Sequence, residues 1–423
     1  MESNSKMSLE LPPAPQDRTG WPWTEATPPL PPTMPNGSPW PKISIVTPSY
    51  NQAQFIEETI RSVLLQGYPN LEYIIIDGGS TDGSVEIIKK YEPWLTCWVS
   101  EPDRGQSHAI NKGFKRSTGD IIAWINSDDY YTKEALKQAA LGMDNYPKAG
   151  LIHGDGFYCS EDGKIIGRQV EKQVDLARLL WYRPLVQPSI FFKRKSLEAV
   201  GELREDLYYR MDFDISIRTA VFFPIQYINF SFSCLRIWPG QKTHDNNISA
   251  QFDEEINVRE TIYKVYSAKN LTVRKIGLDA LSSNLIRASI CCYANFDCNN
   301  GYRFIDKLAL SQRRANKIPI DSIWLGLVYS GLLDRTHSYQ DVNDVIENVM
   351  RAVNIASFNT LLKKIMMRVR VYKAIQLNLR SDVDKVKVIV PTLLLYDTKW
   401  MLRISTLKYL ARIFLLGFQT GGK

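Results

Sequence analysis

Four apolar runs, each followed by a segment with helical spacing, constrain the possible folds of this chain more than any other feature. The runs are KISIVTP (42–48), LEYIIID (71–77), WLTCWVS (94–100) and DIIAWIN (120–126), and the helical segments are 53–66, 85–91, 107–117 and 133–143. Continuous apolar strands are typical of sheets that are buried on both faces. Alternating strands and helices predict a parallel sheet with right-handed crossovers, an α/β fold. Ligands bind such sheets at the carboxyl ends of the strands.

The flanking regions suggest a division into three parts. Residues 1–41 hold eleven of the 22 prolines and form a Pro-rich leader, either packed on the next domain through Trp21, Trp23 and Trp40 or disordered. Residues 42–253 form the α/β domain, in which the mixed segments after Leu151 are predicted to be antiparallel strands closing one side of the sheet. Helical patterns dominate residues 254–423.

Composition narrows the protein class. The chain is 44% hydrophobic and 23% charged, as is usual for globular proteins. It shows no basic-then-apolar signal sequence and no apolar run near the roughly 20 residues that span a bilayer. Its six cysteines form no C-x-x-C pair, which indicates reduced thiols. We therefore expect a cytoplasmic protein.

Three polar loops follow predicted strands: TPSYN (47–51), DGGSTDGS (77–84) and NSDD (126–129). The fold should bring them to one edge of the sheet. The second loop lacks the spacing of the common phosphate-binding loops. It does offer Asp77, which can accept hydrogen bonds from a base, whereas Ser80–Asp82 could instead cap the next helix.

The adjacent carboxylates Asp128 and Asp129 suggest a cation site. Two like charges at a strand end are costly to bury unless a cation compensates them. Mn²⁺ and Mg²⁺ take carboxylates together with phosphate oxygens and water. The alternative is that these residues only cap the helix that follows.

Taken together, residues 42–250 resemble glycosyltransferase family 2, which has the GT-A fold. The resemblance rests on the order and spacing of the first strand, PSYN, DGGSTDGS and NSDD. It implies a Rossmann-like, mostly parallel sheet flanked by helices, here with a mainly helical C-terminal extension. It also implies an inverting enzyme that uses a nucleotide-diphospho-sugar with Mn²⁺ or Mg²⁺.

The resemblance assigns roles to residues at the strand ends. The nucleotide-holding positions of the family match Pro48, Ser49, Tyr50 and Asp77. The family's D-x-D motif is Asn126-Ser-Asp128 here, so Asn126 is expected to meet the ribose. Asp128 is expected to hold both the donor and the metal, with Asp129 as metal support. Arg104 is a candidate for pairing with phosphate.

Downstream positions complete the predicted site. Asp212 in RMDFD matches the general base. Asp214 would lie on the same face as Asp212 if this segment were a strand, but not if it were a helix. A salt bridge to Arg210 or Arg218 is the alternative for either. Gln187 and Ser189 match one wall of the acceptor site. In RIWPGQKTH, Trp238 replaces a family histidine, while Lys242 and His244 are candidates for the diphosphate and the metal.

The net charge of +7 is concentrated at the C-terminal end. Residues 358–423 contain thirteen Lys or Arg and three Asp, and residues 398–418 have the pattern of a basic amphipathic helix. This helix would either lie on an anionic membrane at the inner face of the cell or pack on the core. We expect no nucleic-acid partner, since no binding motif accompanies the charge.

The expected function is therefore sugar transfer to a glycan or glycolipid acceptor. The family's habits favour a UDP-sugar donor. Two alternatives stay open: a non-catalytic nucleotide-sugar-binding scaffold subunit, suggested by Asn126 and Trp238, and a nucleotidyltransferase. The latter would need a basic Gly-rich loop near the N-terminus, which TPSYN does not provide.

Overall fold

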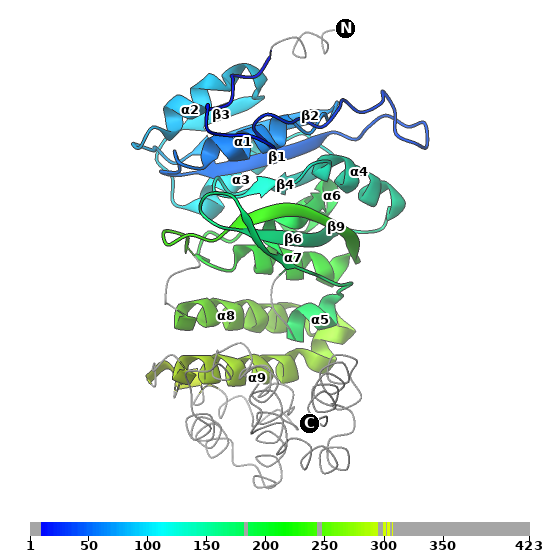
Figure 1. The fold of residues 1–423 in the computed structure, drawn as a ribbon. Coiled ribbons are helices and arrows are strands. Elements are labelled where there is room, and N and C mark those ends of the chain that lie inside the picture. The colour runs from blue at the N-terminus through cyan, green and yellow to red at the C-terminus, as the bar shows by residue number, and fades with distance from the viewer. Residues whose placement is uncertain are drawn as a thin grey trace, which may run out of the picture. The chain divides into compact units, whose positions relative to one another are not determined.

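A computed structural model describes residues 10–181, 185–242, 248–294, 299–301, 303, 304 and 307 (Figure 1). These residues belong to two compact units. The first takes in residues up to 246 together with 257–274, and the second takes in 247–256 and the residues from 275 onwards. The predicted boundaries at 41 and 253 stay predictions.

The parallel half of the sheet is as predicted. Its strands are β1 (Ile43–Ser49), β2 (Leu71–Asp77), β3 (Cys97–Ser100) and β4 (Ile121–Trp124). They lie in the order β3-β2-β1-β4, and every pairing among them is parallel. Ser49 is in register with Asp77, so the first two polar loops leave the sheet side by side.

The predicted helices follow these strands. They are α1 (Ile56–Leu64), α2 (Ser84–Lys90), α3 (Gln106–Arg116) and α4 (Ala135–Asn145), with a 3-10 turn, η2 (Glu92–Trp94), before β3. Gly113 lets α3 cross β1 closely, because a Cβ there would lie 2.3 Å from Val46 Cγ1. This contact fixes the start of α3 near the carboxyl ends of β1 and β4.

The second half of the sheet corrects one prediction. Its elements are β5 (Tyr130–Tyr131), β6 (Leu151–Cys159), β7 (Ile165–Gln169), α5 (Leu176–Trp181), η3 (Gln187–Ser189), β8 (Ile190–Lys193), α6 (Arg194–Val200), α7 (Met211–Phe222) and β9 (Ile225–Arg236). Most pairings here are antiparallel, as expected, but β9 pairs with β6 in parallel. The prediction of only antiparallel strands was wrong because the chain returns through α7 before it enters β9.

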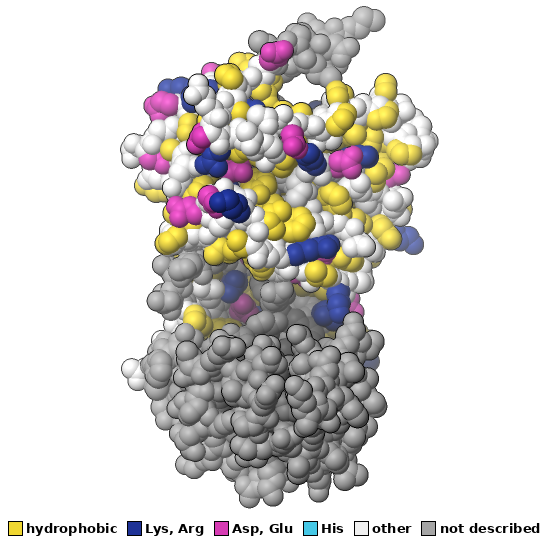
Figure 2. All heavy atoms as spheres, viewed as in Figure 1, with side chains coloured by type: hydrophobic (Ala, Val, Ile, Leu, Met, Phe, Trp, Pro, Cys, Tyr) yellow, Lys and Arg dark blue, Asp and Glu magenta, His cyan; other side chains and the backbone are white. Residues whose placement is uncertain are grey.

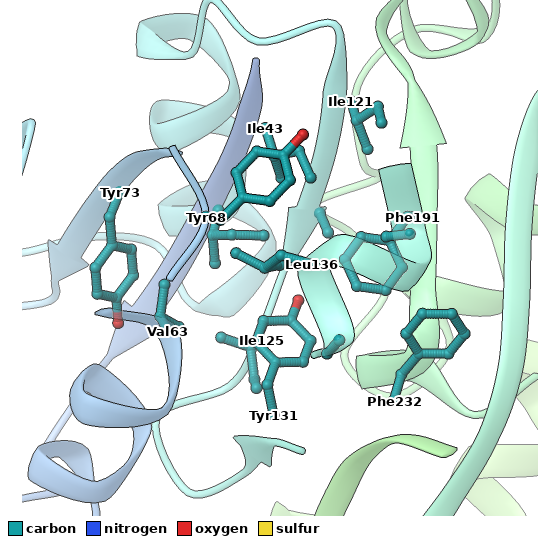
Figure 3. Close-up of a cluster of buried hydrophobic side chains, with 14 of the residues drawn as sticks. Ile43, Val63, Tyr68, Tyr73, Ile121, Ile125, Tyr131, Leu136, Phe191 and Phe232 are labelled. Carbon is teal, nitrogen blue, oxygen red and sulfur yellow. The ribbon is translucent and has the colours of Figure 1, made fainter. Parts of the chain in front are cut away.

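A cluster of buried side chains lies between the sheet and its helices (Figure 3). The ring of Phe191 lies 5.7 Å from that of Tyr131 and 5.2 Å from that of Phe232. Aromatic pairs at such distances add about 0.5–1.5 kcal/mol each beyond the area that they bury. Tyr131 directly follows the acidic loop, so this packing anchors the loop on one side.

The leader packs on the first unit over its described residues. Trp23 and Trp40 are buried. The buried guanidinium of Arg61 donates to the carbonyl oxygens of Pro12 at 2.7 Å, Pro22 at 3.0 Å and Trp23 at 2.7 Å. From residue 10 onwards, the disordered alternative is therefore excluded.

The C-terminal region is helical where it is described, in α8 (Ile248–Tyr266) and α9 (Leu271–Ala294). Within the second unit, Arg287 pairs with Glu255 at 2.6 Å. The predicted amphipathic helix 398–418 lies outside the described residues. Among the helices that are described, none is long and apolar enough to cross a membrane. Acidic and basic side chains are interspersed over the described part of the face in Figure 2.

His153 in β6 makes the stability of the protein pH-dependent. Its side chain is fully buried, and neither ring nitrogen has a hydrogen-bond partner among the described residues. Burial lowers the pKa of His153 to about 4, against the opposing effect of Asp155. Because the unfolded chain binds the proton first, stability falls as pH drops from about 6.5 towards 4.

We expect His153→Leu to lose this acid sensitivity. The loss of unfolding free energy attributable to His153 should reach roughly 2–3 kcal/mol by pH 4.5. Urea unfolding of wild type and variant at pH 7, 5.5 and 4.5 measures it as a difference between the two curves. His108→Leu is the control at a partly exposed histidine. Parallel curves for wild type and His153→Leu would contradict the prediction.

Candidate functional site

The first two predicted loops are bound to each other. The Gly78 amide donates to the Ser49 carbonyl at 2.8 Å, and the Asn51 amide donates to Ser80 Oγ at 2.8 Å. The Ala53 amide donates to Asp82 at 2.9 Å. Ser80 and Asp82 therefore tie the second loop to the first, a role beyond helix capping.

Asp77 organises its own loop. Its buried carboxylate accepts hydrogen bonds from the amides of Gly79 and Ser80 and from the hydroxyls of Ser80 and Ser100, at 2.5–3.0 Å. Both oxygens are engaged by these contacts. Oδ2 accepts three of these hydrogen bonds and Oδ1 only one, so Oδ1 keeps a lone pair for the contact with a base that the resemblance implies.

The PSY positions differ in exposure. Pro48 and Ser49 are buried at the end of β1, whereas the side chain of Tyr50 is 64% exposed. A Cβ on Gly78 would lie 3.3 Å from Tyr50 Cδ2 and 2.8 Å from Asp103 Oδ2. The absence of a side chain at Gly78 therefore lets Tyr50 and Asp103 approach the loop from two sides.

The paired carboxylates follow β4 at the same edge. Asp128 Oδ2 accepts from Trp238 Nε1 at 3.0 Å, and Asp129 Oδ1 accepts from the amide of Arg236 at 3.0 Å. Burial raises the pKa of Asp128, although the bond from Trp238 opposes it. Burial and the charge of Asp128 raise the pKa of Asp129 well above its usual value. Each carboxylate thus makes the other harder to ionise.

This donor set fits an oxygen-seeking divalent cation. A cation would compensate the burial that raises the pKa of both carboxylates and the charge of Asp128 that further raises the pKa of Asp129. Mg²⁺ or Mn²⁺ would take its remaining ligands from phosphate oxygens and water. Within the described ranges, no group of three or more His, Cys, Asp or Glu surrounds the pair. His244, the predicted third ligand, lies outside those ranges.

Arg236 supports the acidic loop from the core. It is fully buried, and its Nε donates to the Asp128 carbonyl at 2.9 Å while Nη2 pairs with Glu58 at 2.8 Å. The guanidinium also lies over the ring of Phe55 at 4.6 Å. Our sequence analysis missed this residue, whose only signal was a charge at the end of a long apolar strand.

Asn126 is held by other amides. Its Oδ1 accepts from Gln106 Nε2 at 2.6 Å, and its Nδ2 donates to Gln187 Oε1 at 3.1 Å and approaches Asp129 Oδ2 at 3.4 Å. Lys242 Nζ donates to Gln106 Oε1 at 2.9 Å. The structure thus brings Asn126, Gln187 and Lys242 together around Gln106, which sequence reasoning did not single out.

Asn126→Asp should destabilise the protein although it restores the acidic residue of the D-x-D motif. The new carboxylate would place an acceptor against the oxygens of Gln187 and Asp129. Replacing a partly buried donor in this way costs about 1 kcal/mol. Thermal unfolding in EDTA measures the change, with Asn145→Asp at the exposed end of α4 as the matched control. An unchanged melting temperature would contradict the prediction.

Arg104 and Ser189 are engaged elsewhere. Arg104 is exposed and pairs with Glu205 at 2.6 Å, so a phosphate would have to compete with that ion pair. Ser189 is fully buried, and its hydroxyl contacts the Asp155 carbonyl and Ser233 Oγ, both at 2.7 Å. The Ser189 hydroxyl is thus engaged inside the fold, and its place in the acceptor wall stays a prediction.

Asp212 and Asp214 are separated by the helix that carries them. Both lie in the first turn of α7, where the helix dipole favours negative charge. Asp214 is buried and pairs with Arg218 at 2.7 Å, whereas Asp212 is only half-buried. The salt-bridge alternative therefore holds for Asp214, and the two carboxylates do not share a face.

The fold, with polar loops at the carboxyl ends of its parallel strands, is of the GT-A type. TarS of Staphylococcus aureus, solved in complex with UDP-GlcNAc, matches with a TM-score of 0.53 at 17% identity. The match covers 76% of this chain and 91% of that one. At this identity the likeness shows the fold.

The sequence comparisons give the family. Residues 44–198 match the model of glycosyl transferase family 2, which places that part of the chain in the family. An uncharacterized glycosyltransferase of Haemophilus influenzae is 28% identical over 45% of this chain and 78% of its own length. The putative teichuronic acid biosynthesis glycosyltransferase TuaG of Bacillus subtilis is 39% identical over 23% of this chain. That match spans 40% of TuaG, less than half of its length.

Proposed function

We propose that this protein is an inverting glycosyltransferase that moves a sugar from a nucleotide-diphospho-sugar to an acceptor hydroxyl, in polysaccharide or glycolipid assembly. One observation carries the proposal. The acidic pair lies at the carboxyl ends of the parallel strands beside Asn126, and Lys242 is joined to Asn126 through Gln106. The names of two relatives, the poly(ribitol-phosphate) beta-N-acetylglucosaminyltransferase TarS and the putative teichuronic acid biosynthesis glycosyltransferase TuaG, support this class of acceptor. A UDP-sugar is the favoured donor.

The donor is held by residues of several loops. Tyr50, with Pro48 and Ser49 behind it, lies beside the nucleotide together with the Asp77 loop. Asn126 meets the ribose, and Asp128 holds the metal with Asp129 as support. Bound there, Mn²⁺ or Mg²⁺ would neutralise the diphosphate as it leaves. Lys242 adds a positive charge for the same group, and Arg104 and His244 are further candidates.

Asp212 acts on the acceptor. Its carboxylate takes the proton from the acceptor hydroxyl while that oxygen attacks the anomeric carbon on the face opposite the diphosphate, which inverts the configuration. Gln187 lies beside Asn126 and is the acceptor-wall candidate whose side chain is only partly buried. The basic amphipathic pattern of residues 398–418 would bring the enzyme to a membrane-bound acceptor.

Release of nucleoside diphosphate from UDP-, GDP- and dTDP-sugars, with Mn²⁺, Mg²⁺ or EDTA, tests the proposal. Slow metal-dependent hydrolysis of one donor is expected in wild type and should be lost in Asp128→Ala. Binding of a donor without turnover, even with pooled acceptors, would favour the scaffold alternative. Failure of every donor to bind with any metal would refute the cation site.

A further inference from the structure

A continuous chain of side-chain amides crosses the strand ends from Lys242 to β4. Lys242 Nζ donates to Gln106, Gln106 to Asn126, Asn126 to Gln187, and Gln187 to the carbonyl oxygen of Trp124, at 2.6–3.1 Å. We propose that Gln106 is a positioning residue that holds the ammonium of Lys242 in place for the diphosphate of the donor. This inference rests on the proposed function.

A backbone carbonyl group sets the donor-to-acceptor direction of this whole series of hydrogen bonds. The Trp124 oxygen, in buried β4, can only accept, so Gln187 must turn its NH₂ towards it and its oxygen towards Asn126. Asn126 must then present its oxygen to Gln106, which leaves the Gln106 oxygen facing Lys242. Each amide is a donor on one side and an acceptor on the other. No single side-chain amide can exchange the positions of its oxygen and nitrogen without losing two hydrogen bonds.

The backbone fixes the other end of Gln106. This residue is the first of α3, directly after Gly105, which has a φ of 108°. A positive φ of that size favours glycine, so the sequence Gly-Gln sets the point at which the helix starts. Gln106 therefore projects from a rigid element, and its orientation is set before any ligand binds.

Lys242 is also held from a second side. Its Nζ lies 3.9 Å from the centre of the Tyr208 ring, a cation–π contact. The amide and the ring are both neutral, so neither of these two contacts cancels the charge of the ammonium. A free lysine side chain carries about 2 kcal/mol of rotamer entropy, and ordering it in advance lowers the cost of binding an anion.

The positioning of Lys242 by Gln106 should matter only for ligands that carry the diphosphate. We would measure binding of UDP and of uridine by calorimetry with Mg²⁺, on the full chain, and compare the ratio of the two affinities. Lys242→Met should lower this ratio about tenfold, the effect of losing one charge-assisted hydrogen bond. Gln106→Met should lower it roughly three- to tenfold, with uridine binding weakened less than UDP binding, because Gln106 also contacts Asn126.

A double variant separates positioning from general damage. If Gln106 acts through Lys242, the double variant Gln106→Met with Lys242→Met should lose no more than Lys242→Met alone. Gln106→Glu keeps an acceptor for Lys242 but cancels its charge, so its ratio should fall below that of Gln106→Met. Gln138→Met, in the middle of α4, is the matched control and should behave like wild type.

Three results would overturn the inference. These are an unchanged ratio in Gln106→Met, additive losses in the double variant, and equal weakening of UDP and uridine. Failure of wild type to bind any nucleotide would instead contradict the proposed function, so the two failures are distinguishable.

Discussion

Asp212→Asn is expected to slow sugar transfer by a factor of about 10²–10⁴, the usual contribution of a general base. Asparagine has nearly the same size and keeps the position in the first turn of α7, but it cannot accept the proton of the acceptor hydroxyl. Donor affinity should be unchanged, because the general base acts on the other substrate. Initial rates at saturating donor, with the acceptor varied, measure the effect on kcat.

Asp214→Asn is the natural comparison for this variant. Asp214 pairs with Arg218 inside the fold, so its substitution should lower the melting temperature. Slow hydrolysis of the donor needs no acceptor hydroxyl and should survive in part in Asp212→Asn. Full transfer activity in a folded Asp212→Asn protein would show that another group accepts the proton.

Arg236→Met is expected to destabilise the protein by about 3–5 kcal/mol, because it leaves Glu58 as an unpaired buried charge. The substitution also removes the hydrogen bond to the Asp128 carbonyl, so the acidic loop should lose its support. Metal affinity should fall with stability for that reason. Urea unfolding and calorimetric titration with Mn²⁺ measure the two effects.

Adding Glu58→Gln to Arg236→Met should recover part of the loss, since the unpaired charge is then gone. Arg116→Met, at the exposed end of α3, is the matched surface control and should change stability by about 0.5 kcal/mol or less. A loss below about 1 kcal/mol in Arg236→Met would mean that solvent reaches Glu58 and that the buried pair carries little stability.

Much of the donor side could be predicted from sequence because it lies on strands that are buried on both faces. Such strands need continuous apolar residues, so LEYIIID and DIIAWIN are recognisable without any partner. The polar residues at their ends then share one edge of the sheet through the parallel topology alone. The positions of Asp77, Asn126 and Asp128 at that edge follow from this argument.

The second half of the sheet was less predictable. Strands β6 and β9 are separated by a long segment that contains the helices α5, α6 and α7, and their parallel pairing depends on the direction in which that segment returns. Pattern along one strand cannot show which strand lies beside it. The same limit concealed the burial of Ser189 between β6 and β9, where its hydroxyl contacts both strands.

The sequence by itself determined the parallel strands, their helices and the acidic residues that end them, because apolar periodicity and chain order are local properties. Only the tertiary structure decided which side chains are available there. It showed that Asp77 is engaged by its own loop, that Trp238 contacts Asp128 and that Gln106 joins Lys242 to Asn126. Such contacts join residues far apart in the chain, and a hydrogen bond depends on distances that no sequence pattern records.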